Sequence, residues 1–591
     1  MPVRSARSIA TLAALTLAGS AWAQTITARG TVYLDRNADG QRQAGEPGVP
    51  GVCVSDGTRV TLTDEAGGYE LEIDAREASI FVVKPRDHQV RIDERGIPRG
   101  YYIHKPMGSP DDGFIFKGVE PTGPLPESVD FALRPAEDPE SFSVLILADP
   151  QPYSLRQLDY FRREVVDRIA TGRANTPGVL FGVSVGDLVG DNLDLLEPLN
   201  QAQSLFGVPW YNVAGNHDIN FMSGRSSATR ADPDRHADET FERVYGPPDY
   251  AFQYADAHFI VLDNVRWQGF DGFSDRTPEE WPTARKPNTG NYRGALSDEQ
   301  LAFVDNYLRF VPRDELVVLL FHIPMEMDGP GVHRIPEQQR LFEILSSHPR
   351  TLSVSGHTHI QRHWFFTDEH GYRHQADPGS NQLHADDPRR FPAPVHHHIN
   401  SGTISGSWYN GLLDETGLPH TTMRDGAPNG YTMLRIDGAR YRSDYIPARE
   451  PDDHAMTIHI APNAEDGLHA VVARGGEDAR VTANVFNGAR GDEVMMRLLP
   501  APETGAGPTA WRAMTFAPGV DPFYREAAER EADAPDGLAT GWGLPGPAPS
   551  HHLWTGSIPA DLPLGTHMVE IRHTDMYGRT AVERRSFRVV E

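Results

Sequence analysis

The 591-residue chain contains a single cysteine, Cys53. It therefore has no intramolecular disulfide and no thiolate cluster for a soft-metal site. After the N-terminus, no segment reaches the roughly 20 apolar residues that a helix needs to span a bilayer. Basic residues are also scarce, because 55 lysines and arginines face 82 aspartates and glutamates, for a net charge of -27. A field of that sign repels nucleic acid, so we expect no nucleic-acid partner.

The first 23 residues have the pattern of a signal peptide. Two arginines precede an apolar run from Ile9 to Leu17, and residues 21–23 (Ala-Trp-Ala) have the small-x-small pattern of a cleavage site. The alternative, an uncleaved anchor helix, is disfavoured because the apolar run is too short to span a membrane. We expect cleavage after Ala23, export to a bacterial periplasm or the exterior, and no transmembrane segment in the mature chain.

The length predicts about three to five domains, and the composition changes twice along the chain. Residues 24–135 show short alternating strands broken by turns, typical of a β-sandwich. Residues 141–405 interleave apolar strands with amphipathic helices, for example over Leu155–Thr171, and predict an α/β or α+β core. Ser297 and Gln300 have capping-box spacing, and Pro336 suits a first helical turn. Strands return in residues 406–591, where we expect a mostly-β domain with a long loop over residues 500–549.

Polar residues follow five apolar strands of the central region. Alone, each segment is equally well explained as a turn, a helix cap or a buried core histidine. Together they favour one site, because open α/β sheets gather ligands at the carboxyl ends of their strands. The five segments are Asp149-Pro150-Gln151, Gly186 to Asp191, Gly215-Asn216-His217-Asp218, His322, and Gly356-His357-Thr358-His359.

This set resembles the calcineurin-like metallophosphoesterase superfamily, whose blocks are Asp-x-His, Gly-Asp-x-x-Asp, Gly-Asn-His-Asp/Glu, a histidine after a strand, and Gly-His-x-His. The resemblance covers about residues 141–363 and implies a four-layer core in which helices sandwich two β-sheets. The flanking β regions resemble the companions found in an exported bacterial branch. Two positions depart from the pattern, because Gln151 stands where most members have histidine and Asp191 falls one position late.

The resemblance implies a dinuclear metal centre with Asp187 as the shared ligand. Carboxylate and amide oxygens with imidazoles suit Mn²⁺, Fe or Zn²⁺, and the amide of Gln151 favours Mn²⁺ slightly. The implied ligands are Asp149, Gln151, Asp187 and His359 for one ion, and Asp187, Asn216, His322 and His357 for the other.

These ligands predict an exported phosphoesterase that hydrolyses a phosphate monoester, diester or pyrophosphate. Two ions about 3.5–4 Å apart would hold a bridging hydroxide and clamp the phosphoryl oxygens. His217 would either protonate the leaving oxygen or stabilise the transition state, with Asp218 orienting its imidazole. Asp191 would either orient a metal ligand or stand in a plain turn. The alternative function is a catalytically degenerate cell-envelope binding module.

Loops at the same edge would select a small phosphorylated substrate. We expect Trp267, Tyr292 and Arg293, together with Asn216, to contact it. Residues 377–409 would form a lid. Their three histidines, 396–398, would line the existing site, with a further metal site as the alternative.

An acidic loop in the N-terminal region fits the spacing of a calcium-binding loop. Oxygen donors occupy its first, third, fifth and twelfth positions, and glycine occupies the sixth. The loop follows a strand rather than a helix, so calcium there would be structural; a turn without an ion is the alternative. Its candidate residues are Asp35, Asn37, Asp39, Gln41 and Glu46.

Overall fold

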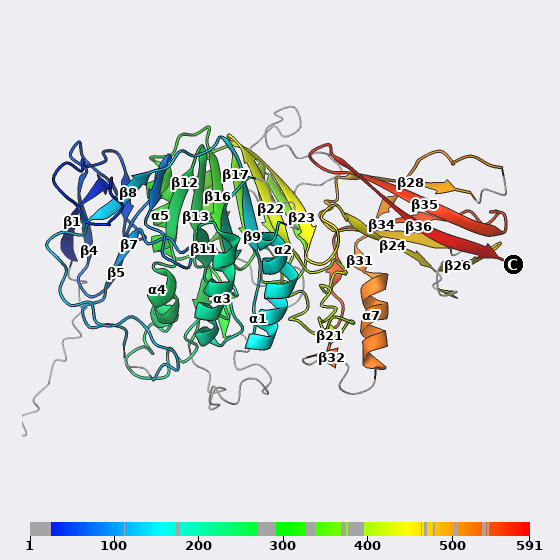
Figure 1. The fold of residues 1–591 in the computed structure, drawn as a ribbon, viewed down its shortest axis with the longest axis horizontal. Coiled ribbons are helices and arrows are strands. Elements are labelled where there is room, and N and C mark those ends of the chain that lie inside the picture. The colour runs from blue at the N-terminus through cyan, green and yellow to red at the C-terminus, as the bar shows by residue number, and fades with distance from the viewer. Residues whose placement is uncertain are drawn as a thin grey trace, which may run out of the picture.

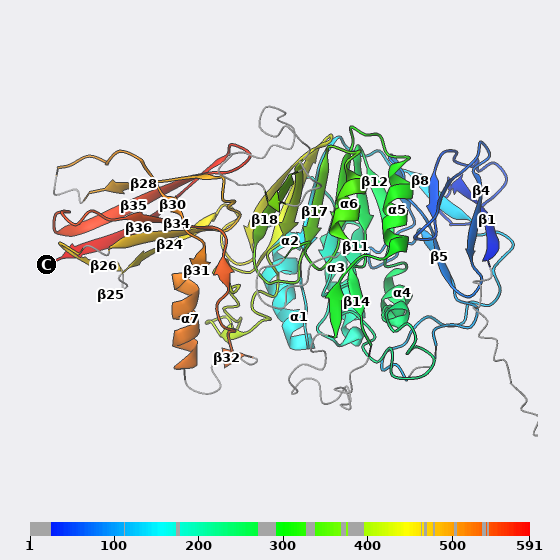
Figure 2. The same cartoon turned by 180° about the vertical axis from the view of Figure 1, so that it is seen from behind.

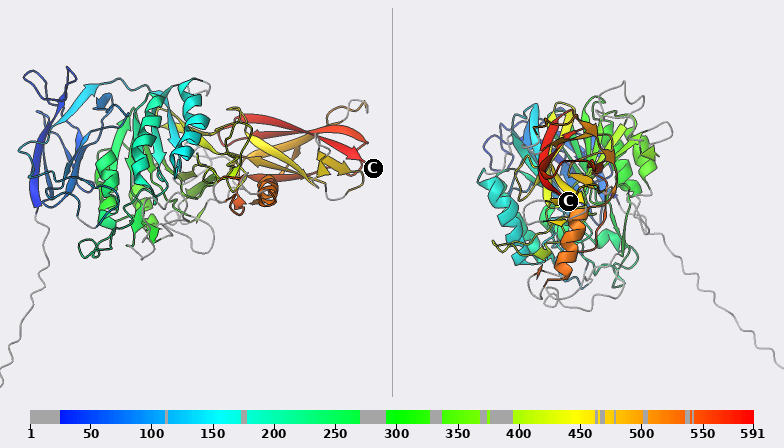
Figure 3. Two further views of the ribbon diagram at one scale, coloured as in Figure 1. Left: turned by 60° about the horizontal axis from the view of Figure 1, so that its bottom comes forward. Right: turned by 90° about the vertical axis from the view of Figure 1, so that its right-hand side faces the viewer.

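The computed structural model describes the chain except residues 1–24, 111–112, 173–177, 270–290, 327–336, 368–373, 376–394, 462–463, 466–469, 477–478, 501–504, 535–538 and 541–542. The predicted signal peptide, Pro336 and most of the predicted lid lie outside the described residues. The described residues form three regions in a row, with a β-rich region at each end of a central α/β region (Figures 1 and 3). Within them, no helix has the length and apolarity to cross a membrane.

The N-terminal region is a sandwich of two sheets, ordered β4-β1-β8-β6 and β3-β2-β5-β7. Alternate residues of β4, Tyr69, Leu71 and Ile73, point into the core between the sheets. The strands are β1 (Thr25–Leu34), β2 (Cys53–Ser55), β3 (Val60–Leu62), β4 (Gly68–Asp74), β5 (Ala78–Val82), β6 (His88–Val90), β7 (Tyr101–His104) and β8 (Phe131–Pro135).

The central region contains two large sheets. The first has the order β11-β10-β9-β22-β23, and the second has the order β12-β13-β16-β17-β20-β18-β19. The strands of the first sheet are β9 (Ser141–Leu147), β10 (Val179–Val185), β11 (Trp210–Val213), β22 (Gly430–Asp437) and β23 (Arg440–Pro447). Those of the second are β12 (Tyr250–Tyr254), β13 (Ala257–Val261), β16 (Leu316–Leu320), β17 (Thr351–Ser355), β18 (Arg362–Thr367), β19 (His374–Gln375) and β20 (Val395–Asn400).

Helices cover the outer face of each sheet, which produces the four layers that the family resemblance implies. In β9, Val144 and Ile146 pack between the two sheets, whereas Leu145 and Leu147 pack against helices. The predicted capping box at Ser297 is present at the start of α5. Helices α1 (Leu155–Phe161), α2 (Asp167–Ala170), α3 (Leu196–Gln203) and α4 (Glu239–Tyr245) lie on the first sheet (Figure 1). Helices α5 (Asp298–Leu308) and α6 (Gln338–Leu345) lie on the second (Figure 2).

The first sheet continues past the domain boundary predicted at residue 405. Strand β22 pairs antiparallel with β9 along Ser141–Ile146, and β23 follows it in a hairpin. The central unit therefore extends to Pro447. A strand's own residues do not reveal which sheet accepts it, so the sequence alone does not show that β22 and β23 belong to the central unit.

The prediction that His396, His397 and His398 belong to a loop is wrong. They lie in β20, between β17 and β18, and all three side chains are buried. Their side chains alternate between the two faces of the sheet and bond to polar neighbours on each. Since buried polar groups with partners are tolerated in a core, a polar run can form an interior strand.

The C-terminal region is a second pair of sheets, ordered β24-β27-β34-β30 and β25-β26-β36-β35-β28-β29. It also contains a helix, α7 (Pro522–Ala532), where the sequence suggests mostly loop. Asp521 caps that helix and proline occupies its first turn. The strands are β24 (Met456–Ala461), β25 (Ala464–Glu465), β26 (Ala470–Ala473), β27 (Arg480–Val485), β28 (Glu493–Leu499), β29 (Arg512–Ala513), β30 (Thr515–Phe516), β34 (Leu553–Ser557), β35 (Gly565–Thr574) and β36 (Thr580–Val590).

A buried ion-pair network joins the N-terminal sandwich to α4. The Lys105 ammonium lies 2.6 Å from a carboxylate oxygen of Glu239 and also pairs with Glu242. Glu239, His236 and Glu77 bring three ligand atoms close together. However, Lys105 already pairs with Glu239, and Arg235 pairs with Glu77. We therefore interpret this group as a contact between regions and not as a cation site.

Replacing Lys105 with Met is expected to lower the free energy of unfolding by about 3–5 kcal/mol, because it leaves two buried carboxylates without their cation. Urea unfolding would measure the loss. Lys117→Met is the matched control, because the Lys117 side chain is 82% exposed. Its expected effect is within about 0.5 kcal/mol. Equal, small effects for both variants would contradict a stabilising role of the network.

Candidate metal centre

The predicted ligands lie at the carboxyl ends of neighbouring parallel strands, where the backbone turns sharply. Five of the seven have positive φ: Asp149 at 47°, Gln151 at 40°, Asp187 at 48°, His357 at 75° and His359 at 55°. This region is uncommon for residues other than glycine, and such strain persists where the surroundings enforce it, often at functional sites. The turns therefore aim the side chains at a common point.

Two motif glycines allow these turns to pack together. A Cβ on Gly215 would lie 1.9 Å from the backbone nitrogen of Asp187. A Cβ on Gly356 would lie 2.3 Å from Oδ2 of Asp149. Both distances are far below van der Waals contact, so these positions require glycine for the ligands to converge.

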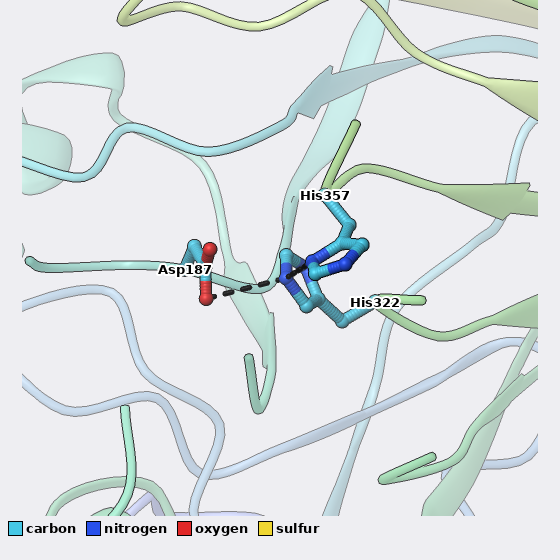
Figure 4. A group of neighbouring side chains, drawn as sticks. All are labelled: Asp187, His322 and His357. Carbon is cyan, nitrogen blue, oxygen red and sulfur yellow. Dashed lines mark hydrogen bonds and ion pairs between the residues drawn. The ribbon is translucent and has the colours of Figure 1, made fainter. Parts of the chain in front are cut away.

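One half of the site is formed by Asp187, Asn216, His322 and His357. Nε2 of His322 lies 3.2 Å from Oδ1 of Asp187, 3.2 Å from Nδ1 of His357 and 3.1 Å from Oδ1 of Asn216. Figure 4 shows Asp187 and the two imidazoles facing one another. Nδ1 of His322 donates to the Val185 carbonyl at 2.9 Å, which leaves the Nε2 lone pair directed into the site.

The other half is formed by Asp149, Gln151 and His359, again beside Asp187. Nε2 of His359 lies 3.6 Å from Oδ1 of Asp149. Nδ1 of His359 donates to the Gly406 carbonyl at 2.6 Å, which fixes the same tautomer as in His322. The Gln151 amide donates to Oδ2 of Asp187 at 3.2 Å, and its buried oxygen has no hydrogen-bond partner among the described residues.

These donors fit a pair of divalent ions. An unpartnered buried amide oxygen and two imidazole lone pairs face two carboxylates, which is a borderline-to-hard ligand set. Gln151 is therefore compatible with metal binding in the place where histidine is usual.

The electrostatics of the site also favour bound cations. Burial raises the pKa of Asp149 to about 8, and the Asp187 carboxylate adds to that rise. Burial also disfavours ionised Asp187, but the neighbouring His322 and His217 hold its pKa below the usual range. Without a cation, the site therefore favours the ionised form of Asp187 and the protonated form of Asp149. Divalent ions would allow both carboxylates to ionise.

Asp191, and not Asp218, contacts the His217 imidazole. Nδ1 of His217 lies 2.6 Å from Oδ1 of Asp191. The Asp218 carboxylate instead accepts hydrogen bonds from the backbone N–H groups of Gly215, Leu188 and Val189. Asp218 therefore joins the turn after β10, which carries Asp187, to the turn after β11, which carries Asn216. Its predicted role as the residue that orients His217 is wrong. Neither predicted alternative for Asp191, a metal-ligand orienter or a plain turn residue, describes this contact.

Comparison with known proteins agrees with this geometry. The sequence profile of calcineurin-like phosphoesterase matches residues 142–361, and the profiles of the N-terminal and C-terminal regions found with it match residues 36–120 and 398–580. The chain belongs to the calcineurin-like phosphoesterase family. It is a metal-dependent phosphoric ester hydrolase, and membership of this family implies a dinuclear metal centre.

Two solved structures resemble this phosphoesterase remotely. A purple acid phosphatase from yellow lupin (Lupinus luteus) seeds aligns with 9% identity and a TM-score of 0.33, covering 72% of this chain and 89% of the lupin chain. GAP50, the anchor in the inner membrane complex of Plasmodium, aligns with 13% identity and a TM-score of 0.27, covering 52% of this chain and 85% of its own. No curated protein matches the sequence.

Three aromatic residues pack against histidines of the phosphoesterase site. Tyr292 meets His357 edge-on at 5.9 Å between ring centroids. Tyr153 meets His217 in the same manner at 6.1 Å, and Trp408 stacks on His359 at 4.0 Å. Of these, only Tyr292 is among the predicted substrate contacts. Tyr153 stands two residues after Gln151, and Trp408 lies within the predicted lid, so position alone could have identified both.

The structure places two other predicted substrate residues differently. Trp267 is 5% exposed and lies in the core, where its indole N–H donates to the Ser223 carbonyl at 2.9 Å. It lies opposite Tyr292 in the two-stranded antiparallel sheet of β14 (Val265–Trp267) and β15 (Tyr292–Gly294). Arg293 is exposed on β15, opposite Arg266 of β14. Trp267 is therefore a packing residue.

Proposed function

We propose that the protein is an exported dinuclear-metal phosphoesterase acting on a phosphate monoester, diester or pyrophosphate. The convergence of seven donors, five of them on strained turns, carries this proposal. A degenerate binding module would not need to retain the complete donor set. The N-terminal sequence pattern supports export to the periplasm or exterior.

The metal ligands would be those at the two halves of the site. When bound, the ions, Mn²⁺, Fe or Zn²⁺, would act as Lewis acids on the phosphoryl oxygens and lower the pKa of an attacking water. Asn216 would also approach the phosphoryl group, because it lies next to His217 in the same turn. The proposed ligands are Asp149, Gln151, Asp187, Asn216, His322, His357 and His359.

His217 would donate the proton that the leaving oxygen needs. Its Nδ1–H donates to Asp191, and its Nε2 lies 3.9 Å from Oδ2 of Asp187, at the edge of the site. The Asp191 carboxylate stabilises the protonated imidazole and fixes its orientation. Tyr292, which lies beside His357, is placed to contact the organic group of the substrate.

A substrate screen tests the proposed activity. The metal-loaded protein would be assayed with p-nitrophenyl phosphate, p-nitrophenyl phenylphosphonate, bis(p-nitrophenyl) phosphate and a nucleotide pyrophosphate. We expect turnover of at least one class, and the ratio among them identifies the preferred ester. No turnover of any by the fully loaded protein would favour the binding module.

The acidic N-terminal loop is proposed to bind structural Ca²⁺. Asp35 is buried, and its carboxylate oxygens accept from the N–H groups of Ala38 at 2.7 Å and Gly40 at 3.0 Å. Asn37, Asp39, Gln41 and Glu46 complete the set.

Changing Asp35 and Asp39 to Ala is expected to abolish stabilisation by calcium. With the affinity usual for extracellular sites, 10 mM Ca²⁺ should add about 1–3 kcal/mol to the unaltered protein relative to EDTA. Thermal unfolding of both proteins with and without Ca²⁺ would measure this stabilisation. The comparison separates the loss of calcium binding from the loss of the turn's hydrogen bonds, which lowers stability in either condition. Turnover per folded molecule should stay nearly unchanged. Equal calcium responses in both proteins would show that the loop is a turn without an ion.

A further inference from the structure

A chain of buried hydrogen bonds runs along the boundary between β17 and β20. It alternates hydroxyl groups of β17 with imidazoles of β20 on one face of the sheet. His396 bonds to Thr351 at 2.8 Å and to Ser353 at 2.7 Å. His398 bonds to Ser353 at 2.7 Å and to Ser355 at 3.1 Å. We call this set, with Asn400, the Ser/His ladder.

The ladder ends at the turn that carries two metal ligands. The Ser355 hydroxyl donates to Oδ1 of Asn400 at 3.2 Å. The Asn400 amide donates to Oγ1 of Thr358 at 2.7 Å and to the Ile360 carbonyl at 2.6 Å. Thr358 stands between His357 and His359, and Ile360 follows them, so Asn400 holds the turn at two points around His359.

The hydrogen bonds of Asn400 determine which group donates and which accepts in every bond of the ladder. The Ile360 carbonyl can only accept, so the NH₂ group of Asn400 faces it and Oδ1 faces Ser355. Ser355 therefore donates to Asn400 and accepts from Nε2–H of His398. Nδ1 of His398 then accepts from Ser353, Ser353 accepts from Nε2–H of His396, and Nδ1 of His396 accepts from Thr351.

Both imidazoles are neutral in this arrangement. Burial lowers the pKa of His396 to about 3 and that of His398 well below its usual value. Each ring nitrogen already has a hydrogen-bond partner, which leaves no lone pair for a metal. The amide of Asn400 lies between the last hydroxyl of the ladder and Thr358, so the ladder does not form a simple proton relay to the site.

We infer that the Ser/His ladder positions the His357–His359 turn for metal binding. Aligned hydrogen bonds in a dry interior strengthen one another, and outer partners of this kind fix the orientation of metal ligands. The turn needs such support because His357 and His359 both have positive φ. The inference rests on the proposed metal centre, and His396, His398 and Asn400 are its positioning residues.

Titration of the metal-free full-length chain with Mn²⁺ tests this inference. His398→Phe removes two ladder bonds but retains the packing, because His398 stacks on Phe321 at 5.6 Å. His397→Phe is the matched control. It also removes two bonds, to His363 and Tyr441, and retains a stack on Phe365, but on the opposite face of the strand. Thr358→Val removes only the terminal bond at a half-buried position, which protects the test against loss of folding.

We expect 10–100-fold weaker Mn²⁺ binding for His398→Phe and a smaller loss for Thr358→Val. His397→Phe should bind Mn²⁺ as the unaltered chain does, even where its unfolding temperature falls equally. Equal weakening in His397→Phe and His398→Phe would overturn the inference, because affinity would then follow stability alone. Unchanged binding in both ladder variants would also overturn it. If the unaltered chain bound no Mn²⁺, the proposed metal centre itself would fail, and the inference with it.

Discussion

Removal of all divalent metal is expected to abolish hydrolysis, and Mn²⁺ or another transition ion is expected to restore it. The ligand set contains no group that could replace the Lewis acid, and His217 supplies only a proton. Dialysis against a chelator, elemental analysis and re-addition of single ions would measure the effect. The ion that restores the highest turnover at equal occupancy also identifies the preferred metal.

Metal removal should also lower the unfolding temperature. Asp149 and Asp187 are both fully buried, and bound cations would stabilise their ionised forms. The Asp35 and Asp39 double variant serves as the control, because it separates the effect of the catalytic ions from that of Ca²⁺. Full turnover by protein shown to be metal-free would contradict the proposed centre.

His217→Asn is expected to lower turnover by about 10²–10⁴-fold on esters with basic leaving groups. Asn216, and not His217, is the proposed ligand, so metal content and fold should be retained. The loss should be much larger for an alkyl phosphate than for a p-nitrophenyl ester, because p-nitrophenolate leaves without needing a proton. Steady-state kinetics on the two esters would compare these losses.

Asp191→Asn extends the same test. An asparagine at this position keeps the size of the side chain but removes the charge that stabilises the protonated imidazole, so its loss should also grow with leaving-group basicity. Equal losses on both esters would instead indicate that His217 stabilises the phosphoryl oxygens. Loss of bound metal from His217→Asn would make the residue structural.

The fold and the meeting of the motifs could be predicted because their signals are local. An apolar strand followed by a glycine turn and a polar residue has the same form at Asp187 and at His357. Parallel strands bring such ends together without further information. All residues of β9 after Ser141 are buried, and its apolar run is typical of a strand that is covered on both faces.

The hydrogen-bond partners of the buried histidines could not be predicted in the same way. Asp191 and Asp218 both lie in the motifs around His217, and the sequence alone does not show which carboxylate reaches the imidazole. The histidines of β20 have the composition of a loop. Their burial is favourable because hydroxyl groups on β17 bond to His396 and His398, whereas His363 and Tyr441 bond to His397. The hydroxyl groups on β17 lie more than 40 residues away from these histidines in the sequence.

The place of β22 and β23 in the first sheet restricts how this protein could have evolved by exchange of segments. The two strands come after the catalytic motifs in the sequence and lie within the match to the C-terminal profile. In the structure, however, β22 pairs with β9, the strand that leads to Asp149. A recombination event between residues 405 and 430 would separate β9 from its neighbour and expose its unpaired backbone groups. Exchange after Pro447 would keep the sheet whole. Lineages that replaced the C-terminal sandwich are therefore expected to have retained the β22–β23 hairpin with the catalytic region.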